Sequence, residues 1–182
     1  RQWVRHRTAN INEYSLRYSE ARDEFYLPDP EHIQFQSSLN KQGRLGEVSD
    51  SLKAKVSDYF QEISNRSFEI YSELNDAGVA RELARAVLPV NLYTEWYWKN
   101  DLHNLLHFVG LRSDSHAQYE IRVFSDAMAE SVKKVAPFAW EAYQDYVISG
   151  LRFSRIEQSL LEQNLPERVI DDILEDIAYQ IT

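Results

Sequence analysis

The segment VSDSLKAKVSDYFQEISNRSFEIYSEL, residues 48–74, decides the fold class of this chain. Its apolar residues recur mostly at three- and four-residue intervals, the period of one helical face. They are Leu52, Val56, Tyr59, Phe60, Ile63, Phe68, Ile70 and Leu74. The spacing predicts one long amphipathic helix over 48–74, allowing a bend near Asn65, and Asp76-Ala77-Gly78 ends it.

Outward from this helix, the flanking segments predict more helices than strands. Ser15–Phe25 mixes aromatic and polar residues at strand-like spacing, residues 31–47 indicate a flexible loop, and the branched and aromatic residues of Val90–Trp98 indicate a strand of a central sheet. Further helices are expected at 79–87, ended by Pro89, and at 101–108, capped by Asp101 and stopped by Gly110. Another begins at Ser115, with Ile121, Phe124, Met128 and Val132 as its apolar face, and three more are expected at 138–148, 153–161 and 166–181. The predicted class is α+β and helix-rich, with a small central, mostly antiparallel sheet.

Composition limits the classes of protein that the chain can belong to. A length of 182 residues, 43% of them hydrophobic and 13% aromatic, is sufficient for one domain with a substantial core. The net charge of −9 disfavours a general nucleic-acid binder, which needs a basic field. No apolar run has the length of a membrane span, and no signal peptide is recognised. We therefore expect a cytoplasmic protein with neither nucleic acid nor membrane as a partner.

A cationic segment stands out near the chain start. Arg5-His6-Arg7 is followed, after seven intervening residues, by Ser15 and then by Arg17. Guanidinium groups match phosphate or carboxylate oxygens two at a time, and several in one short segment repel one another unless an anion lies between them. The segment is therefore either an anion site or an ordinary solvated basic turn.

The segment RQWVRHRTANINEYSLRYS, residues 1–19, resembles the RHR-x7-S motif of the flavin-dependent thymidylate synthases, the thymidylate synthase complementing protein family. Residues 81–98, RELARAVLPVNLYTEWYW, and 100–121, NDLHNLLHFVGLRSDSHAQYEI, resemble the same family in the same order. The resemblance covers about residues 1–136. It implies a homotetramer and a single domain over 1–182 that lacks the N-terminal portion of the family, with 150–182 as a C-terminal helical extension.

The resemblance implies conversion of dUMP to dTMP, with methylenetetrahydrofolate as carbon donor and FAD, reduced by NADPH, as hydride source. The chain has no cysteine, so it cannot attack the pyrimidine with a thiolate, the better-known route to thymidylate. A reduced flavin supplies the kind of chemistry that a protein can only position. The absence of cysteine and the resemblance therefore agree.

By the same resemblance, eight residues contact the nucleotide. They are Gln2, Arg5, Glu13, Ser15, Leu16, Arg17, Arg85 and Arg112. Backbone donors near Ser15 and Leu16 help to hold the phosphate, and Arg17 serves the site of a neighbouring chain. The resemblance implies that Arg112 is the catalytic residue, since its family counterpart lies against the uracil and favours the N3-ionised form; a fixed cation there would stabilise negative charge developing toward C5. The alternative for Arg112 is an ordinary salt bridge with Asp114.

The resemblance also implies a flavin site. Its residues are Arg5, His6, Arg7, Glu13, Asp101, His103 and His107. The spacing places His103 and His107 on one helical face, with Asp101 near the positive end of that helix. Taken without the family, such a histidine pair is also compatible with half of a metal site or with an exposed face. We expect no metal.

Two other residues have chemistry that the prediction leaves aside. Ser15 lacks an evident base in a Ser-His-Asp order and is expected to position a ligand rather than attack it. His116 is interpreted as a structural histidine near a helix start. The alternative functions are an inactive nucleotide- or flavin-binding fragment, and a helical interaction module whose basic segment docks an acidic partner.

Overall fold

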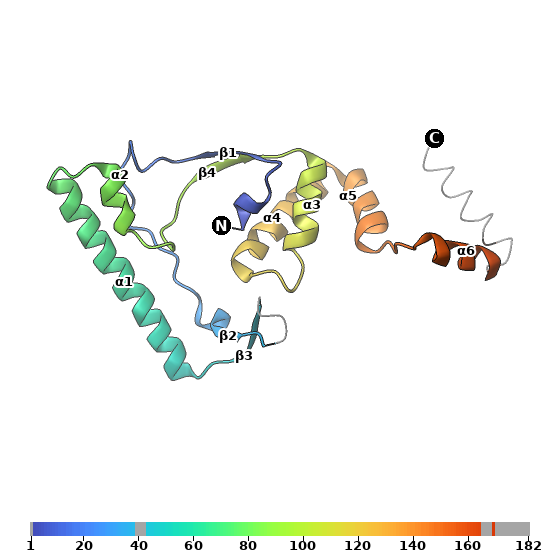
Figure 1. Ribbon diagram of the computed structural model, residues 1–182, viewed down its shortest axis with the longest axis horizontal. Coiled ribbons are helices and arrows are strands. Elements are labelled where there is room, and N and C mark those ends of the chain that lie inside the picture. The colour runs from blue at the N-terminus through green and yellow to red at the C-terminus, as the bar shows by residue number, and fades with distance from the viewer. Residues whose placement is uncertain (1, 39–42, 165–168, 170–182) are drawn as a thin grey trace. The chain divides into compact units, whose positions relative to one another are not determined.

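A computed structural model describes residues 2–38, 43–164 and 169 of the chain (Figure 1). Helices predominate in this part, and the strands pair antiparallel, so the predicted α+β, helix-rich class is confirmed. Residue contacts divide the chain into two compact units, 1–132 and 133–182, which we describe separately. The single domain with an extension from residue 150 stays a prediction.

The long helix expected from residues 48–74 is α1, Asp50–Asp76. It runs for 27 residues without interruption at Asn65. The end is set by Gly78, whose φ of +76° is in the left-handed region that glycine tolerates. The N–H of Gly78 donates to the carbonyl of Asn75, and that of Val79 donates to the carbonyl of Leu74, both at 2.9 Å. This pattern closes the last turn and confirms the predicted stop.

A small buried core joins α1 to the segment that follows it. After Gly78 the chain forms α2, Arg81–Ala84, and η3, Arg85–Val87, which confirms the helix expected before Pro89. Tyr71 and Ala84 are buried against Ala21, and five partly buried side chains surround them: Leu16, Phe68, Leu74, Leu88 and Leu92. The Tyr71 hydroxyl accepts a hydrogen bond from the backbone N–H of Ala21 at 2.9 Å. The core therefore fixes the loop after Ser15 against α1.

Tyr71→Phe is expected to lower the free energy of unfolding by about 1–3 kcal/mol, the cost of leaving a buried N–H without an acceptor. The ring remains, so packing is preserved and the change isolates the hydrogen bond to Ala21. Urea unfolding followed by circular dichroism measures it. Tyr59→Phe on the same helix is the matched control, because Tyr59 is 53% exposed and should change stability by only a few tenths of a kcal/mol.

A two-stranded ribbon runs between the two helical parts of the first unit (Figure 1). β1, Asn10–Glu13, pairs antiparallel with β4, Trp96–Lys99, so that Asn10 lies opposite Lys99 and Glu13 opposite Trp96. The Asn10–Lys99 end therefore leads to the chain start and to the helix after β4, and the Glu13–Trp96 end leads to Ser15 and to the segment after η3.

The strand predictions need correction. The expected strand at Ser15–Phe25 is wrong: the N–H groups of Tyr18 and Ser19 both donate to the Ser15 carbonyl, which makes residues 15–19 a turn. Only its last residue, Phe25, forms a bridge, with Leu92. In the expected strand Val90–Trp98, a bond from Leu92 N–H to the Pro89 carbonyl folds the first residues into a turn. The described strands form two separate two-stranded sheets and not one central sheet.

Residues 31–47, expected as a flexible loop, contain regular structure on both sides of the undescribed positions. After η2, Pro30–His32, β2, Gln34–Gln36, pairs antiparallel with β3, Arg44–Glu47. Gly46 has a φ of +82°, which a residue with a side chain adopts only with strain. The strands are short and fully exposed, so the apolar alternation that reveals a half-buried strand is absent.

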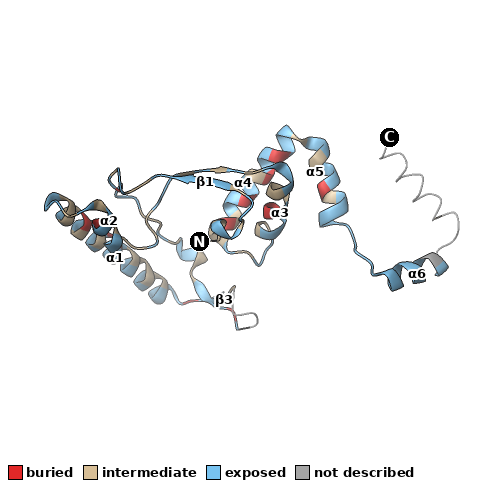
Figure 2. Ribbon diagram, turned by 45° about the horizontal axis from the view of Figure 1, so that its top comes forward, coloured by how far each residue is buried: buried red, intermediate tan, exposed pale blue. Residues whose placement is uncertain are grey.

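Two helices follow the ribbon. Asp101 caps α3, Leu102–Arg112, as predicted, by accepting a bond from the backbone N–H of Asn104 at 2.8 Å. The helix continues through Gly110, so the predicted stop there is wrong. α4, Tyr119–Val135, begins four residues later than the expected Ser115. Figure 2 marks the buried residues of both helices in red on the ribbon. On α4 these are Ile121, Ser125, Ala129 and Val132, whereas Phe124, expected in the apolar face, is 52% exposed.

The second unit is helical in its described part. α5, Pro137–Tyr143, continues into a short π-helical turn, η4, Gln144–Ile148, and α6, Arg155–Asn164, follows a linker. The helices predicted at 138–148 and 153–161 are thus confirmed with small shifts, and the one predicted at 166–181 lies outside the described residues apart from 169. Within residues 2–38 and 43–164, no helix combines the length and hydropathy needed to cross a membrane.

Candidate functional site

An open cleft of about 450 Å³ collects four of the predicted nucleotide-binding residues. Glu13 ends β1, Ser15 and Leu16 begin the turn after it, and Arg85 comes from η3 on the other side. We call these four residues the cleft group. The remaining lining comes from Tyr14 and from the segment before β4, namely Leu88, Pro89, Val90, Leu92 and Thr94. Residues 70 positions apart in the sequence therefore share one cleft.

The turn at Ser15 presents unused backbone donors. The Ser15 carbonyl accepts from two N–H groups, and the Ser15 hydroxyl accepts from the N–H of Arg17 at 3.3 Å. The N–H groups of Ser15 and Leu16 themselves have no acceptor among the described residues. The Leu16 side chain packs on the Tyr71 core. A fixed turn with free N–H groups is a feature of anion-binding sites.

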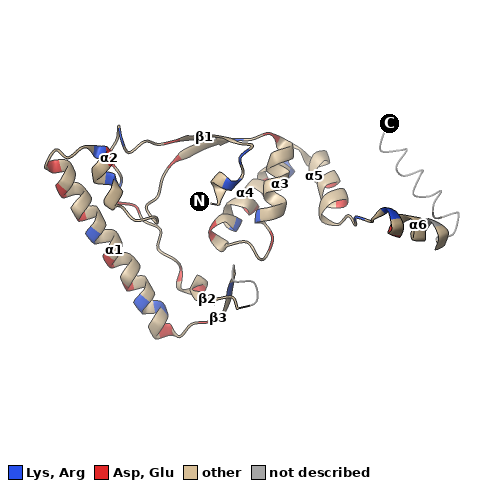
Figure 3. Ribbon diagram, in the orientation of Figure 1, with Lys and Arg blue, Asp and Glu red and all other residues tan. Residues whose placement is uncertain are grey.

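The arginines of the predicted site lack carboxylate partners within the part of the chain that the structure describes. This holds for Arg5, Arg7, Arg17, Arg85 and Arg112, although the chain carries nine more acidic than basic residues. Four other arginines, by contrast, have a carboxylate within 3.0 Å: Arg22, Arg44, Arg66 and Arg81. Figure 3 shows basic residues on the N-terminal segment and on α2. Unpaired arginines on an acidic protein indicate sites for an external anion.

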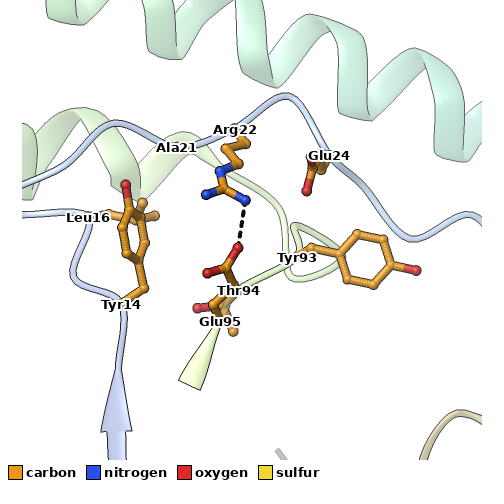
Figure 4. A pocket seen from close by; sticks show the side chains of 8 residues that line it. All are labelled: Tyr14, Leu16, Ala21, Arg22, Glu24, Tyr93, Thr94 and Glu95. Atoms are coloured by element: carbon orange, nitrogen blue, oxygen red, sulfur yellow. Dashed lines mark hydrogen bonds and ion pairs between the residues drawn. The ribbon is translucent and has the colours of Figure 1, made fainter. Parts of the chain in front are cut away.

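A small cavity of about 40 Å³ adjoins the cleft and shares Tyr14, Leu16 and Thr94 with it (Figure 4). Arg22 pairs there with Glu95 at 2.6 Å, with both side chains largely exposed. Thr94 donates its hydroxyl proton to the carboxylate of Glu13 at 2.9 Å. Glu13 thus has a neutral partner, Thr94, and Arg85 has no carboxylate partner among the described residues.

A second group of predicted residues gathers around Arg112, the last residue of α3. The Nε of Arg112 donates a hydrogen bond to Nε2 of His6 at 3.0 Å, across 106 positions of sequence. Burial lowers the pKa of His6 below its ordinary value, and the charges of Arg112 and His107 lower it further. Gln2, at the start of the same N-terminal turn, has a buried side-chain carbonyl oxygen with no donor in the described chain. We call Gln2, His6, His107 and Arg112 the Arg112 group.

An aromatic cluster supports the Arg112 group. It consists of Trp3, Trp96, Trp98, Phe108 and Phe124. Trp3 stacks on the fully buried Phe108 with ring centroids 5.0 Å apart, and it meets Trp96 and Trp98 edge-on at 5.6 and 5.2 Å. The two β4 tryptophans lie two positions apart and therefore project to one face of the strand. The cluster anchors η1, Trp3–Arg5, and so brings His6 to α3.

The α3 residues predicted for flavin binding differ in their surroundings. Asp101 accepts from the backbone N–H and the side-chain amide of Asn104, and these hydrogen bonds lower the pKa of its carboxyl. His103 and His107 are exposed. The described residues contain no group of three or more potential metal ligands. Asp101 therefore has a capping role whatever else it binds, and the histidines are accessible to a ligand.

The alternative partner for Arg112 is wrong. Asp114 instead accepts from the backbone N–H and the ring Nδ1 of His116, at 2.7 and 2.8 Å, which lowers the pKa of the Asp114 carboxyl. His116 thus has the structural role near a helix start that the sequence suggested. The bond between His6 and Arg112 was missed, because nothing in the sequence indicates a contact between segments so far apart.

Comparison with known proteins decides the family. Residues 1–138 match the family model described as thymidylate synthase complementing protein. The chain belongs to this family. It is 48% identical over 163 residues to the flavin-dependent thymidylate synthase of Ehrlichia ruminantium, a match covering 90% of this chain and 55% of that protein. To the enzyme of the same name from Ruegeria pomeroyi it is 49% identical over 158 residues, covering 85% of this chain and 52% of that protein.

A solved structure extends the similarity to the fold. The UMP/dUMP methylase PolB from Streptomyces cacaoi, bound with 5-Br UMP, matches with a TM-score of 0.74 and 33% sequence identity, over 79% of this chain and 66% of that one. The chain spans about half the length of the curated relatives it matches. The family resemblance is therefore confirmed, and the roles of the site residues remain predictions.

The cleft group and the Arg112 group lie at opposite ends of the β1–β4 ribbon. His6 precedes β1 and Arg112 follows β4, on the side of the Asn10–Lys99 pair, whereas the cleft opens beyond the Glu13–Trp96 pair. The ribbon between them spans about 10 Å, at about 3.4 Å a residue. Within one chain, the structure thus brings the predicted residues together in two places and not in one.

Proposed function

We propose that the protein is a flavin-dependent thymidylate synthase that converts dUMP to dTMP. A methylene group from methylenetetrahydrofolate bonds to C5 in place of hydrogen, and a hydride completes the methyl group, giving tetrahydrofolate and oxidised flavin that NADPH reduces again. The observation that carries this proposal is the cleft group: an arginine without a carboxylate partner among the described residues lines the same cleft as Ser15 and Leu16, whose N–H groups have no acceptor there, on an acidic chain of this family. The family relatives are named for the same activity.

The cleft group suits the phosphate of dUMP. Arg85 offers a fork of donors, and the N–H groups of Ser15 and Leu16 add two neutral donors that need no counter-charge. Arg17, exposed and without a carboxylate among the described residues, is available to the same anion or to that of a neighbouring copy. Glu13, held by Thr94, is an acceptor for a sugar hydroxyl or a ring N–H.

Arg112 suits the pyrimidine. Its Nε is occupied by His6, so its two Nη groups remain for a ligand. A cation held beside the uracil O2–N3 edge stabilises negative charge on the ring, and delocalisation of that charge raises electron density at C5. The chain has no cysteine to activate the ring by addition, so this electrostatic activation is the route open to these 182 residues.

The residues around the chain start fit a flavin dinucleotide. Arg5 and Arg7 are exposed and lack carboxylate partners within the described ranges, which suits a pyrophosphate. The buried carbonyl oxygen of Gln2 has no donor among the described residues, and a ring N–H or a hydroxyl would supply one. His103 and His107 add accessible imidazoles on α3. When bound, the reduced flavin supplies the hydride.

The proposal includes a homotetramer with shared sites. A pyrimidine nucleotide needs the cleft group for its phosphate and Arg112 for its ring, and one chain places these at opposite ends of a ribbon. A complete site forms where the cleft of one copy meets the Arg112 group of another copy. The closed symmetry of the oligomer then gives several equivalent sites. A cytoplasmic enzyme acting on small molecules is consistent with the acidic composition.

The test measures dTMP formation and dUMP binding by the full-length protein. With methylenetetrahydrofolate, FAD and NADPH, the wild type is expected to release the C5 label of deuterated dUMP and to form dTMP. Arg85→Ala is expected to weaken dUMP binding about 10- to 100-fold by calorimetry, since a hydrogen bond to a charged group is worth about 1.5–3 kcal/mol.

Arg66→Ala is the matched control, because Arg66 on α1 pairs with Glu69 and lies outside the cleft. It should bind dUMP as the wild type does. A protein that binds FAD and dUMP without turnover supports the inactive-fragment alternative. One that binds neither supports the interaction module and refutes the proposed function.

A further inference from the structure

We propose that His6 is a positioning residue for Arg112: its neutral ring accepts the Nε–H of Arg112 and orients the guanidinium so that both Nη groups face the pyrimidine. This inference rests on the proposed function and adds to it a role for the motif histidine that is separate from flavin contact. It also predicts how the activity depends on pH.

The chemistry of the two side chains fixes the direction of the bond. Arginine has five N–H donors and no acceptor, and its guanidinium is not deprotonated in proteins. At 3.0 Å from Arg112 Nε, the His6 Nε2 must therefore be the acceptor, with the ring proton on Nδ1. Nε carries a single hydrogen at the base of the planar guanidinium. A bond at that hydrogen sets the plane of the group without using the forked end.

The imidazole is itself held in place. Its ring lies edge-to-face on Phe108, with centroids 4.7 Å apart at 70°, and Phe108 is fully buried and stacked on Trp3. The backbone N–H of His6 donates to the Trp3 carbonyl at 3.0 Å, which closes η1. His6 and Arg112 are both half-buried. The aromatic cluster thus determines where the acceptor lies, and the acceptor determines how Arg112 points.

Protonation of His6 removes the hydrogen bond between its Nε2 and the Nε–H of Arg112. An imidazolium has no acceptor, and it places a second cation against Arg112. Among the described residues, the charged and titratable groups that act on the ring are Arg112 and His107, both on α3, and the aromatic cluster beside the ring, with members from η1, β4 and α4, is uncharged. The bond is therefore intact at neutral pH and is lost as the pH falls through the pKa of His6, which burial places below the ordinary value.

Two substitutions separate positioning from other roles of His6. His6→Gln keeps a side-chain acceptor at nearly the same reach and cannot titrate. His6→Phe keeps an aromatic ring against Phe108 and has no acceptor. His6→Phe is expected to lower kcat about 100-fold, the typical cost of a misplaced catalytic group, with the KM for dUMP changed less than kcat. His6→Gln should keep kcat within about tenfold of the wild type.

The readouts are the pH profile of kcat, the flavin content and the nitrogen NMR signals of the His6 ring, all on the full-length protein. The wild type should lose kcat on an acid limb that disappears in His6→Gln. The limb should persist in the control His32→Gln, because the His32 ring stacks on Tyr119 instead. Wild-type NMR at neutral pH should show the neutral Nδ1–H tautomer. Flavin content is measured in both His6 variants as well, because the family resemblance places His6 at the flavin, and kcat is therefore expressed per bound flavin.

Three results overturn the inference: an acid limb retained in His6→Gln, an Nε2–H tautomer at neutral pH, or a loss of kcat per bound flavin that is equal in His6→Phe and His6→Gln, which shows that the side-chain acceptor has no effect. The NMR readout needs no turnover. If the wild type makes no dTMP while the Nδ1–H tautomer is present, the proposed function fails and the His6–Arg112 geometry stands.

Discussion

Arg112→Ala in the full-length protein is expected to abolish most release of hydrogen from C5 of labelled dUMP, lowering kcat about 100- to 1000-fold. Arg112 is the arginine of α3, and its Nε donates a hydrogen bond to His6, which leaves the two Nη groups for the pyrimidine. Their loss removes a charge placed where negative charge develops on the ring. Deuterium release followed by mass spectrometry measures the step directly, before the methyl group is completed.

The fold should survive this change. Arg112 is half-buried, it ends α3 rather than lying within the helix, and its described polar contact is the bond to His6. Circular dichroism and flavin content therefore serve as controls, with Arg66→Ala as the matched arginine variant. Arg112→Lys keeps the charge but loses the planar fork, and it should recover only a small part of the activity. Retention of most deuterium release by Arg112→Ala would remove Arg112 from the mechanism.

The sequence predicted the helices well because helical periodicity is strong over long segments. Residues 48–74 repeat their apolar positions for seven turns, and the structure places α1 within two residues of those bounds. Gly78 and Asp101 predicted a helix end and a helix start through backbone chemistry that acts locally. Gly110 failed as a stop because a glycine within a helix is tolerated where the neighbours Phe108 and Val109 are buried.

The strands were predicted poorly because they are short and their partners are distant. β1 has four exposed residues, NINE, so no alternation marks it, and it exists because β4 pairs with it from about 86 positions away. The turn at Ser15 was mistaken for a strand because its aromatic and polar residues alternate as they do in strands. Long-range pairing overrides such local preferences.

The candidate site was predictable as a set of residues but not as an arrangement. The family motifs supplied Arg5, Ser15, Arg85 and Arg112. In the described ranges, the structure gives none of the three arginines a carboxylate partner. Nothing in the sequence indicated that Ser15 and Arg85 share a cleft while Arg112 lies beyond the ribbon. That division depends on strand register, which sequence patterns specify weakly for polar strands.

The division of the site leads to the second prediction, which concerns mixed oligomers. Arg85→Ala and Arg112→Ala proteins, each nearly inactive alone at low dUMP concentration, are expected to regain activity when unfolded, mixed in equal amounts and refolded together. If a site takes its cleft from one copy and Arg112 from another, a mixed oligomer contains sites in which both arginines are intact. Random assembly puts about one quarter of the sites in that state.

The experiment distinguishes shared sites from sites within one chain, because the mixture regains no activity if each site lies within one chain. In that case every chain in the mixture carries one of the two defects, and no site holds both Arg85 and Arg112. Refolding each variant alone controls for losses in the procedure, and a mixture of Arg112→Ala with the double variant, which has no intact Arg112, must stay inactive. Recovery near one quarter of wild-type activity requires that the two ends of the β1–β4 ribbon meet only between copies, since the ribbon holds them about 10 Å or more apart within a chain.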